Sequence, residues 1–166
     1  MSIYKPTELL EFLKGLGISP RKALSQNFLI DGNIIRKIVK SANVSADDTV
    51  LEIGSGPGSL TEALLETGAK VIAVEKDPIL SNALHRLKSP DRNLEIHAAD
   101  ILTFPIEKYV ANQKLKVIAN LPYNITTPII AKLIPKRDLI SSLTLMVQME
   151  VAKRFTADPN TPEYGS

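Results

Sequence analysis

The sequence predicts an α/β fold with a doubly wound, mostly parallel sheet. Short runs rich in β-branched residues alternate with stretches of helical period through the middle of the chain, as in parallel strands joined by crossover helices. A glycine-rich turn, Gly54-Ser55-Gly56-Pro57-Gly58, comes directly after the first of these runs, and such turns are typical of nucleotide-binding sheets. The chain has 166 residues, of which 44% are hydrophobic and 23% charged, so a single domain with one compact core is expected.

Two helices are expected before the sheet. The first covers 7–14, where leucines recur at helical spacing, and 15–25 links it to the second. The second covers 33–41 and is capped by Asp31, whose carboxylate can accept hydrogen bonds from the first free amides. Its apolar stripe is expected to lie in the core and consists of Ile34, Ile35, Ile38 and Val39.

Five strands and four further helices complete the prediction. The strands are expected at 49–53, 70–74, 94–97, 116–119 and 142–147. A helix at 60–66 comes after the glycine-rich turn, and another helix covers 150–155. Asp77 is expected to cap a helix whose first residue is Pro78, and the same arrangement is expected for Thr127 and Pro128, because proline loses nothing where the amide is unpaired.

Composition excludes several classes of function. The chain has no cysteine, which removes disulfides, thiolate metal sites and thiol nucleophiles. His85 and His97 have no acidic partner at ligand spacing and are expected to be packing or surface residues, so no metal site is predicted. No signal peptide and no run of 18 apolar residues occurs, so a cytoplasmic protein without a membrane partner is expected.

The positive charge is concentrated at the start of the chain. The net charge is only +2, but residues 1–41 contain seven Lys or Arg against three Asp or Glu. This basic segment is a candidate nucleic-acid surface, although an ordinary solvated surface explains it equally well. The candidate RNA contacts are Arg21, Lys22, Lys153 and Arg154.

The glycine-rich turn and two carboxylates suggest a nucleoside ligand without a phosphate. Glu75 ends the second strand, where a carboxylate can accept hydrogen bonds from both ribose hydroxyls. Ser59 stands where the dinucleotide pattern requires Gly or Ala, so S-adenosylmethionine fits better than a dinucleotide. Asp100, after the third strand, can accept from an adenine amine, although it can equally be a loop cap.

The most specific feature is the run Asn120-Leu121-Pro122-Tyr123 after the fourth strand. An exocyclic adenine amine is a poor nucleophile, and hydrogen-bond acceptors favour its cation-like transition state. The side-chain oxygen of Asn120 and the carbonyl of Leu121 can be these acceptors, Pro122 stiffens the turn, and Tyr123 can stack on the base. The alternative is a β-turn with a buried tyrosine.

These motifs together resemble one enzyme family. Gln26-Asn27-Phe28-Leu29, the segment LEIGSGPGSLT at 51–61, Glu75, Asp100 and the segment NLPYNITTP at 120–128 are similar to those of the ribosomal RNA adenine N6-dimethyltransferases. The erythromycin-resistance rRNA methylases share the QNF and N-x-PY motifs. The ending PGSLT of the first glycine motif and the Thr-Pro pair resemble the small-subunit branch.

The resemblance implies a class I S-adenosylmethionine-dependent methyltransferase with a Rossmann-like sheet. It implies two methyl transfers to N6 of each of two adjacent adenosines near the 3′ end of small-subunit rRNA within a pre-ribosomal particle, with S-adenosylhomocysteine as product and no metal. Phe28 is expected to be a core residue and Gln26 a support for the cofactor. By the same resemblance, cofactor contacts are assigned to Gln26, Asn27, Leu29, Gly54, Gly56, Gly58, Glu75, Asp100 and Asn120, which also reaches the target amine.

The resemblance also predicts that this chain is the first part of a longer protein. The whole of 1–166 is expected to be a truncated N-terminal catalytic domain, with 1–41 as a basic helical segment within it, and with further strands and a helical C-terminal domain missing. A monomer is expected. The alternatives are an rRNA-binding assembly factor whose methylation is secondary, a large-subunit methylase of the resistance type, and a nicotinamide oxidoreductase, which leaves the NLPY run unexplained.

Overall fold

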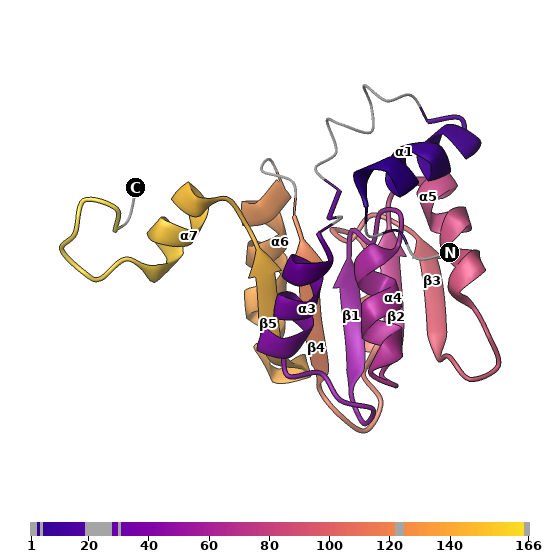
Figure 1. Ribbon diagram of the computed structural model, residues 1–166. Helices are drawn as coiled ribbons and strands as arrows, with labels where there is room; N and C mark the ends of the chain where they lie inside the picture. Colours follow the sequence, from indigo (N-terminus) through magenta and orange to yellow (C-terminus); the bar gives the residue numbers. More distant parts are fainter. Residues whose placement is uncertain (1–2, 4, 19–27, 30, 122–124, 165–166) are drawn as a thin grey trace.

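The computed structural model describes residues 3, 5–18, 28–29, 31–121 and 125–164 (Figure 1). Five strands form one sheet in which every neighbouring pair is parallel, in the order β3-β2-β1-β4-β5. The strands are β1 (Thr49–Ile53), β2 (Lys70–Glu75), β3 (Leu94–Ala98), β4 (Leu115–Asn120) and β5 (Ile140–Met146). The predicted α/β fold with a parallel sheet is confirmed, and each predicted strand is present within two residues of its expected bounds.

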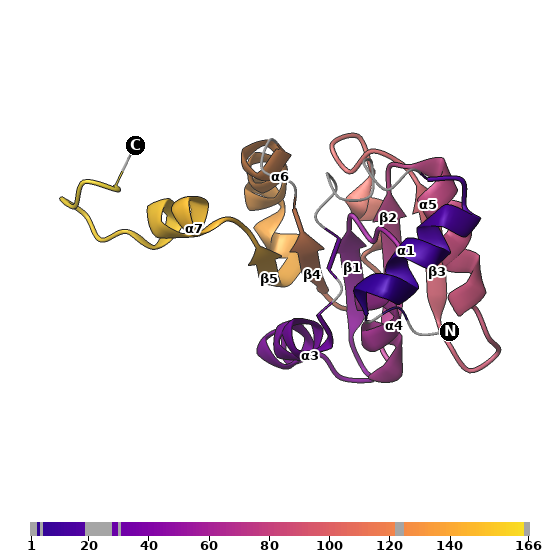
Figure 2. The ribbon, with the colours of Figure 1, turned by 45° about the horizontal axis from the view of Figure 1, so that its top comes forward.

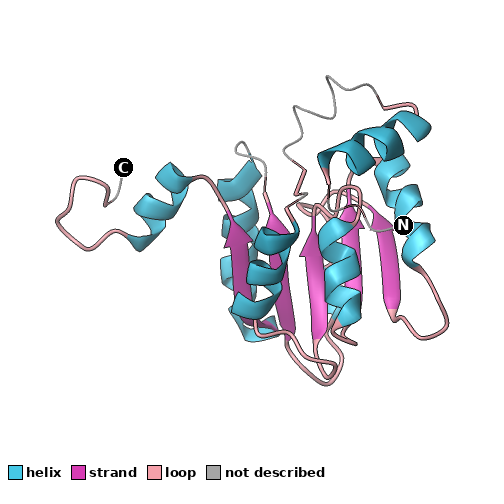
Figure 3. Ribbon diagram, in the orientation of Figure 1, coloured by secondary structure: helices cyan, strands magenta, loops and turns pink. Residues whose placement is uncertain are grey.

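Helices cover both faces of the sheet (Figures 2 and 3). The α-helices are α1 (Pro6–Gly15), α3 (Gly32–Ser41), α4 (Ser59–Glu66), α5 (Pro78–Ala83), α6 (Thr126–Leu133) and α7 (Met149–Thr156). The 3-10 helices are η1 (Leu84–Leu87), η2 (Ile106–Tyr109) and η4 (Ile134–Leu139). Helices α3 and α4 pack on one face with η1, and α6 and η2 pack on the other. In the described part of the chain, every helix is too short or too polar to span a membrane.

Alternating side chains divide the core into two layers. Val50 and Val71 point to the α4 side, whereas Leu51 and Ile72 point to the α6 side, and all four are fully buried. Because both faces are covered, the central strands are continuous apolar runs, as expected for a parallel sheet. Glu52 is the exception, since it occupies an inward position in β1 and is 1% exposed.

The helix starts agree with the predicted caps in two cases and differ in a third. Asp31 accepts hydrogen bonds from the amides at the start of α3, and Asp77 does the same for α5. The prediction that Thr127 caps a helix is wrong, because α6 begins at Thr126 with Ile125 at the cap position. Pro128 is then the third helical residue, where its missing amide still costs no intrahelical bond.

The apolar stripe of α3 is only partly in the core. Ile35 is 1% exposed, and Ile38 and Val39 pack against the core from its edge, but Ile34 is 42% exposed, so its predicted core position is wrong.

The topology brings the ends of the central strands to one edge. Ile53 is in register with both Val74 of β2 and Ala119 of β4. The next residues, Gly54, Glu75 and Asn120, therefore meet at the same edge. The strand order reverses between β1 and β4, and ligands of open α/β sheets bind at this kind of position.

Candidate functional site

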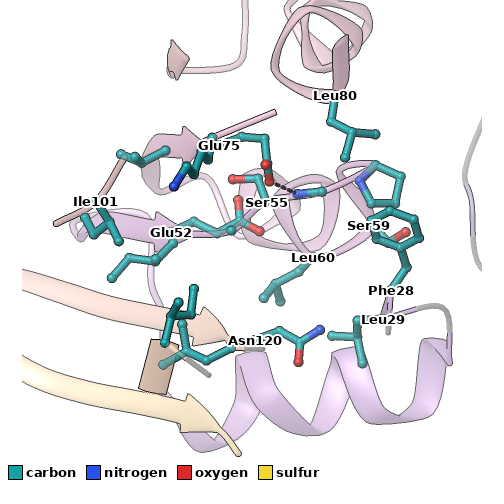
Figure 4. Close-up of a pocket in the computed structure, with 18 of the residues that line it drawn as sticks. Phe28, Leu29, Glu52, Ser55, Ser59, Leu60, Glu75, Leu80, Ile101 and Asn120 are labelled. Carbon is teal, nitrogen blue, oxygen red and sulfur yellow. Dashed lines mark hydrogen bonds between the residues drawn. The ribbon is translucent and has the colours of Figure 1, made fainter. Parts of the chain in front are cut away.

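A pocket of about 230 Å³ opens at this edge of the sheet (Figure 4). It is lined by the glycine-rich turn after β1, by Glu75 at the end of β2 and by Asp100 after β3. Asn120 closes it from the end of β4, and Phe28 lies beside the glycine-rich turn. Four separate strand ends thus contribute to one cavity. Of the predicted cofactor residues that the structure describes, Leu29, Gly54, Gly56, Glu75, Asp100 and Asn120 line it, whereas Gly58 does not.

The glycine-rich turn has a backbone shape that other residues rarely adopt. Gly54, Gly56 and Gly58 have φ values of +72°, +53° and +93°. A Cβ atom at Gly58 would lie 2.7 Å from a methyl carbon of Leu84, so this position is closed by packing as well as by backbone angle. Helix α4 begins at the next residue, with its free N-terminal amides at the turn.

Glu75 is held by backbone amides on both sides. Its Oε2 accepts from the amide of Gly56 at 2.7 Å, and its Oε1 accepts from the amide of Asp77 at 2.9 Å. The side chain lines the pocket and only 9% of the residue is exposed. A carboxylate oxygen can accept more than one hydrogen bond, so Glu75 retains capacity for two ligand hydroxyls.

Asp100 lies at the rim of the pocket in an ion pair that no sequence pattern predicts. Its Oδ2 accepts from Lys76 Nζ at 2.8 Å, and its Oδ1 accepts from the amide of Leu102 at 2.9 Å. The Lys76 ammonium, followed by this amide, lowers the pKa of Asp100. Asp100 is therefore both a loop cap and a pocket carboxylate, and the two interpretations of it are compatible.

Asn120 and Leu121 occupy the β4 side of the pocket. Both line the cavity, and the amide of Leu121 donates to the carbonyl of Met146, which fixes the chain after β4 against β5. Leu29 lines the pocket from the N-terminal segment. Of the other predicted residues, Arg21, Lys22, Gln26, Asn27, Pro122 and Tyr123 lie outside the described residues.

Two residues of the pocket were missed or assigned differently. Phe28 was expected in the core, but it is half-buried and lines the pocket as well as packing on an apolar cluster. Glu52 is absent from the predicted site residues, although the sequence shows a signal for it, namely a charged residue inside a largely apolar strand.

The environment of Glu52 favours its protonated form. Burial raises the pKa of its carboxyl group to about 7, and the hydroxyl of Thr61, which donates to Oε2 at 2.6 Å, opposes part of this effect. The nearby carboxylate of Glu75 raises the pKa further. The floor of the pocket is thus acidic, and a positively charged ligand would draw Glu52 into its ionised form.

The predicted basic contacts lie elsewhere. Lys153 and Arg154 are exposed on α7, which extends away from the sheet (Figure 1). Among the described side chains, no group of three His, Cys, Asp or Glu residues is placed to hold a metal ion.

Comparison with known sequences gives a family match over most of the chain. The family model described as "Ribosomal RNA adenine dimethylase" matches residues 17–166. The chain is 57% identical to "Ribosomal RNA small subunit methyltransferase A" of Protochlamydia amoebophila over 171 aligned residues, covering 100% of this chain and 60% of that protein. It is 45% identical to the protein of the same name from Chlamydia caviae, covering 100% and 59%. The chain thus spans about 60% of the length of these relatives.

Solved structures agree with the sequence matches. The fold is similar to a dimethyladenosine transferase from Plasmodium falciparum, with a TM-score of 0.69 and 34% identity over 81% of this chain and 48% of that one. It is also similar to the 23S rRNA methyltransferase ErmE, with a TM-score of 0.70 and 32% identity over 80% and 52%. An RNA methyltransferase from Salinibacter ruber shares the fold at 19% identity, with a TM-score of 0.54 over 69% of each chain.

Proposed function

The chain belongs to the ribosomal RNA adenine dimethylase family, and from this premise we propose that it transfers methyl groups from S-adenosylmethionine to N6 of adenosines in small-subunit rRNA. The finer proposal is dimethylation of two adjacent adenosines near the 3′ end. The small-subunit branch is supported by the name of the 57% identical relative, and the adenine target by the description of the family. A large-subunit target is the alternative, since ErmE has a similar fold.

The pocket fits S-adenosylmethionine in its donor and acceptor chemistry. Glu75 retains acceptor capacity for ribose hydroxyls, and Asp100 is a second carboxylate at the rim. The buried Ser55 Oγ lies near enough to Glu52 to lower the pKa of that carboxyl group. Within the described residues this hydroxyl makes no hydrogen bond of normal geometry. Because it lies in the pocket lining, a bound ligand would complete its hydrogen bonding. We assign the remaining cofactor contacts to Gln26, Asn27, Leu29, Gly54, Gly56 and Asn120, and to Gly58 the role of shaping the turn, because it packs against Leu84 instead of lining the pocket. When bound, the cofactor supplies an electrophilic methyl group on a sulfonium centre.

The protein's own part in the reaction is positioning and charge stabilisation. Asn120, at the end of β4, offers a side-chain oxygen to one N–H of the target amine, and the Leu121 carbonyl offers a second acceptor. These acceptors favour the developing positive charge on the amine without removing the proton first, so no strong base is needed. Pro122 and Tyr123 complete the proposal as a rigid turn and a stacking surface.

The proposed substrate requires a base outside its stack. An adenine within a helix cannot reach a pocket at the end of a sheet, so the target nucleotide must be unstacked or flipped. We propose rRNA within a pre-ribosomal particle as the substrate, a cytoplasmic location, and a monomeric enzyme. Arg21, Lys22, Lys153 and Arg154 remain candidate phosphate contacts.

The convergence of the glycine-rich turn, Glu75 and Asn120 at one strand edge carries this proposal. Calorimetry with S-adenosylmethionine and NAD tests the cofactor, and binding of NAD alone would favour an oxidoreductase. Transfer of labelled methyl groups to undermethylated small subunits tests the activity. Asn120→Ala is expected to abolish methyl transfer while affinity for the particle is retained. Unchanged methylation in this variant would contradict the catalytic assignment and favour a role in assembly.

A further inference from the structure

The N-terminal segment forms an apolar cluster of its own. We call this the N-terminal cluster, and its buried members are Ile3, Leu9, Leu13, Ile18 and Leu80. Ile3 is completely buried and Leu13 is 1% exposed, although both precede the part of the chain that matches the family model. Leu80 belongs to α5, and α1 lies beside α5 at the edge where the strands end (Figures 1 and 2). A segment outside the family match is therefore packed next to the pocket.

Two hydrogen bonds join the surroundings of this cluster to the glycine-rich turn. Ser59 Oγ donates to the carbonyl of Ile3 at 2.8 Å, in a buried position. Arg86 Nη2 donates to the carbonyl of Pro57 at 2.7 Å. Pro57 and Ser59 flank Gly58, whose left-handed backbone forms the end of the turn. The shape of the turn therefore depends on partners outside the sheet.

Arg86 also contacts α1 directly. Its guanidinium carbon lies 5.1 Å from the centroid of the Phe12 ring, in cation–π geometry. Phe12 packs against the N-terminal cluster. One side chain thus connects α1 to the backbone of the glycine-rich turn, and the guanidinium is half-enclosed between them.

A third connection reaches the pocket wall. Phe28 packs against the N-terminal cluster and also lines the pocket. A Cβ atom at Gly56 would lie 3.1 Å from the Phe28 ring, so ring and turn are in close contact. Movement of α1 would therefore disturb both the turn and the aromatic wall beside it.

We propose that Arg86 is a positioning residue that couples the docking of α1 to the shape of the glycine-rich turn and thereby sets the affinity for S-adenosylmethionine. The ligand in this inference rests on the proposed function. The effect is expected on cofactor affinity and KM rather than on kcat, because Arg86 acts through Pro57 and touches no reacting atom. Loss of a hydrogen bond from a charged donor predicts a weakening of about tenfold or more.

Three variants separate this role from general stability. Arg86→Ala removes both contacts, Arg86→Lys restores a cation that can donate to Pro57, and Phe12→Leu keeps an apolar side chain but removes the ring face. Arg36→Ala is the matched control, because Arg36 is an exposed arginine on α3 that bonds to Asn33. Binding of S-adenosylmethionine is measured by calorimetry, and hydrogen exchange is measured at the amides of 54–59, apart from Pro57, which has none.

The expected result is a graded loss. Arg86→Ala and Phe12→Leu should weaken binding and speed exchange at 54–59, while exchange in β1 stays slow. Arg86→Lys should recover part of the affinity and part of the protection from exchange. Arg36→Ala should match the wild type in both measurements. Wild-type affinity and exchange in both Arg86→Ala and Phe12→Leu would overturn the inference. Faster exchange throughout the sheet would reduce Arg86 to a structural residue and overturn it too. Failure of the wild type to bind S-adenosylmethionine would overturn the proposed function, whereas the exchange measurement would still decide the coupling.

Discussion

Replacing Glu52 by Gln is expected to change how stability depends on pH. Glu52 is 1% exposed, and its carboxyl group has a pKa of about 7 in the folded protein against 4.5 as the ordinary value. Gln has nearly the same shape, carries no charge, and can still accept the hydrogen bond from Thr61 through its side-chain oxygen. The substitution therefore removes the titration and leaves the packing.

The sign and size of the effect come from proton linkage. Between pH 4.5 and 7 the folded protein keeps a proton on Glu52 that the unfolded chain has lost, so the stability contributed by Glu52 is greatest below 4.5 and falls as the pH rises through 7. At about 1.4 kcal/mol per pKa unit, the loss across this window is about 3 kcal/mol. In Glu52→Gln this loss is absent, so the stability of the variant relative to the wild type should rise by about that amount across the window.

Urea unfolding at intervals between pH 4.5 and 8 measures the effect. The difference in unfolding free energy between wild type and Glu52→Gln should change steadily up to pH 7 and then level off. Glu66→Gln makes the same exchange at an exposed position of α4 and controls for the substitution itself. Parallel curves for wild type and Glu52→Gln over the whole range would refute the raised pKa.

Three further substitutions test the site and its supports. In thermal melts, Gly58→Ala should destabilise the protein by about 2 kcal/mol or more, because φ is +93° and the new Cβ would meet a side chain at 2.7 Å. Gly15→Ala is the control, and it should be neutral or slightly stabilising because its new Cβ would lie in open space. Lys76→Leu should raise the pKa of Asp100 toward its ordinary value, because the ammonium is the largest cause of its lowering, and an unshifted carboxyl-carbon titration by NMR would contradict this. Asp77→Ala should cost about 1 kcal/mol through loss of the α5 cap, and an unchanged urea midpoint would show that this cap contributes nothing.

Local signals explain why most elements were predictable. The strand at 70–74 is predictable because three of its five residues are β-branched, and β2 extends only one residue further, to Glu75. The cap at Asp77 is predictable because a capping side chain bonds to amides only two and three residues away in the sequence. The prediction for Thr127 is wrong because α6 begins one residue earlier, at Thr126, which is 2% exposed, and the cap position falls on Ile125, whose side chain cannot accept a hydrogen bond.

Contacts between distant segments explain what the sequence did not reveal. The partner of Asp100 is Lys76, which is 24 residues away, and the partner of Ser59 is Ile3, which is 56 residues away. Neither pair of residues is related by a helical or strand periodicity, or by a motif of fixed spacing, that could be read from a single sequence. Glu52 shows the same limit, since its position in a strand was visible but its hydroxyl partner on α4 was not.

The predictable and unpredictable parts of the site differ in physical kind. Residues that face the pocket were found because parallel strands bring their carboxyl ends together, so position in a strand alone places Glu75 and Asn120. Residues that hold other parts of the pocket wall come from helices: Arg86 donates to Pro57 and Thr61 donates to Glu52, and these pairings depend on how the helices pack. Since affinity depends on preorganisation as well as on contact, substitutions of these supporting residues should change cofactor binding without altering any group that touches the ligand.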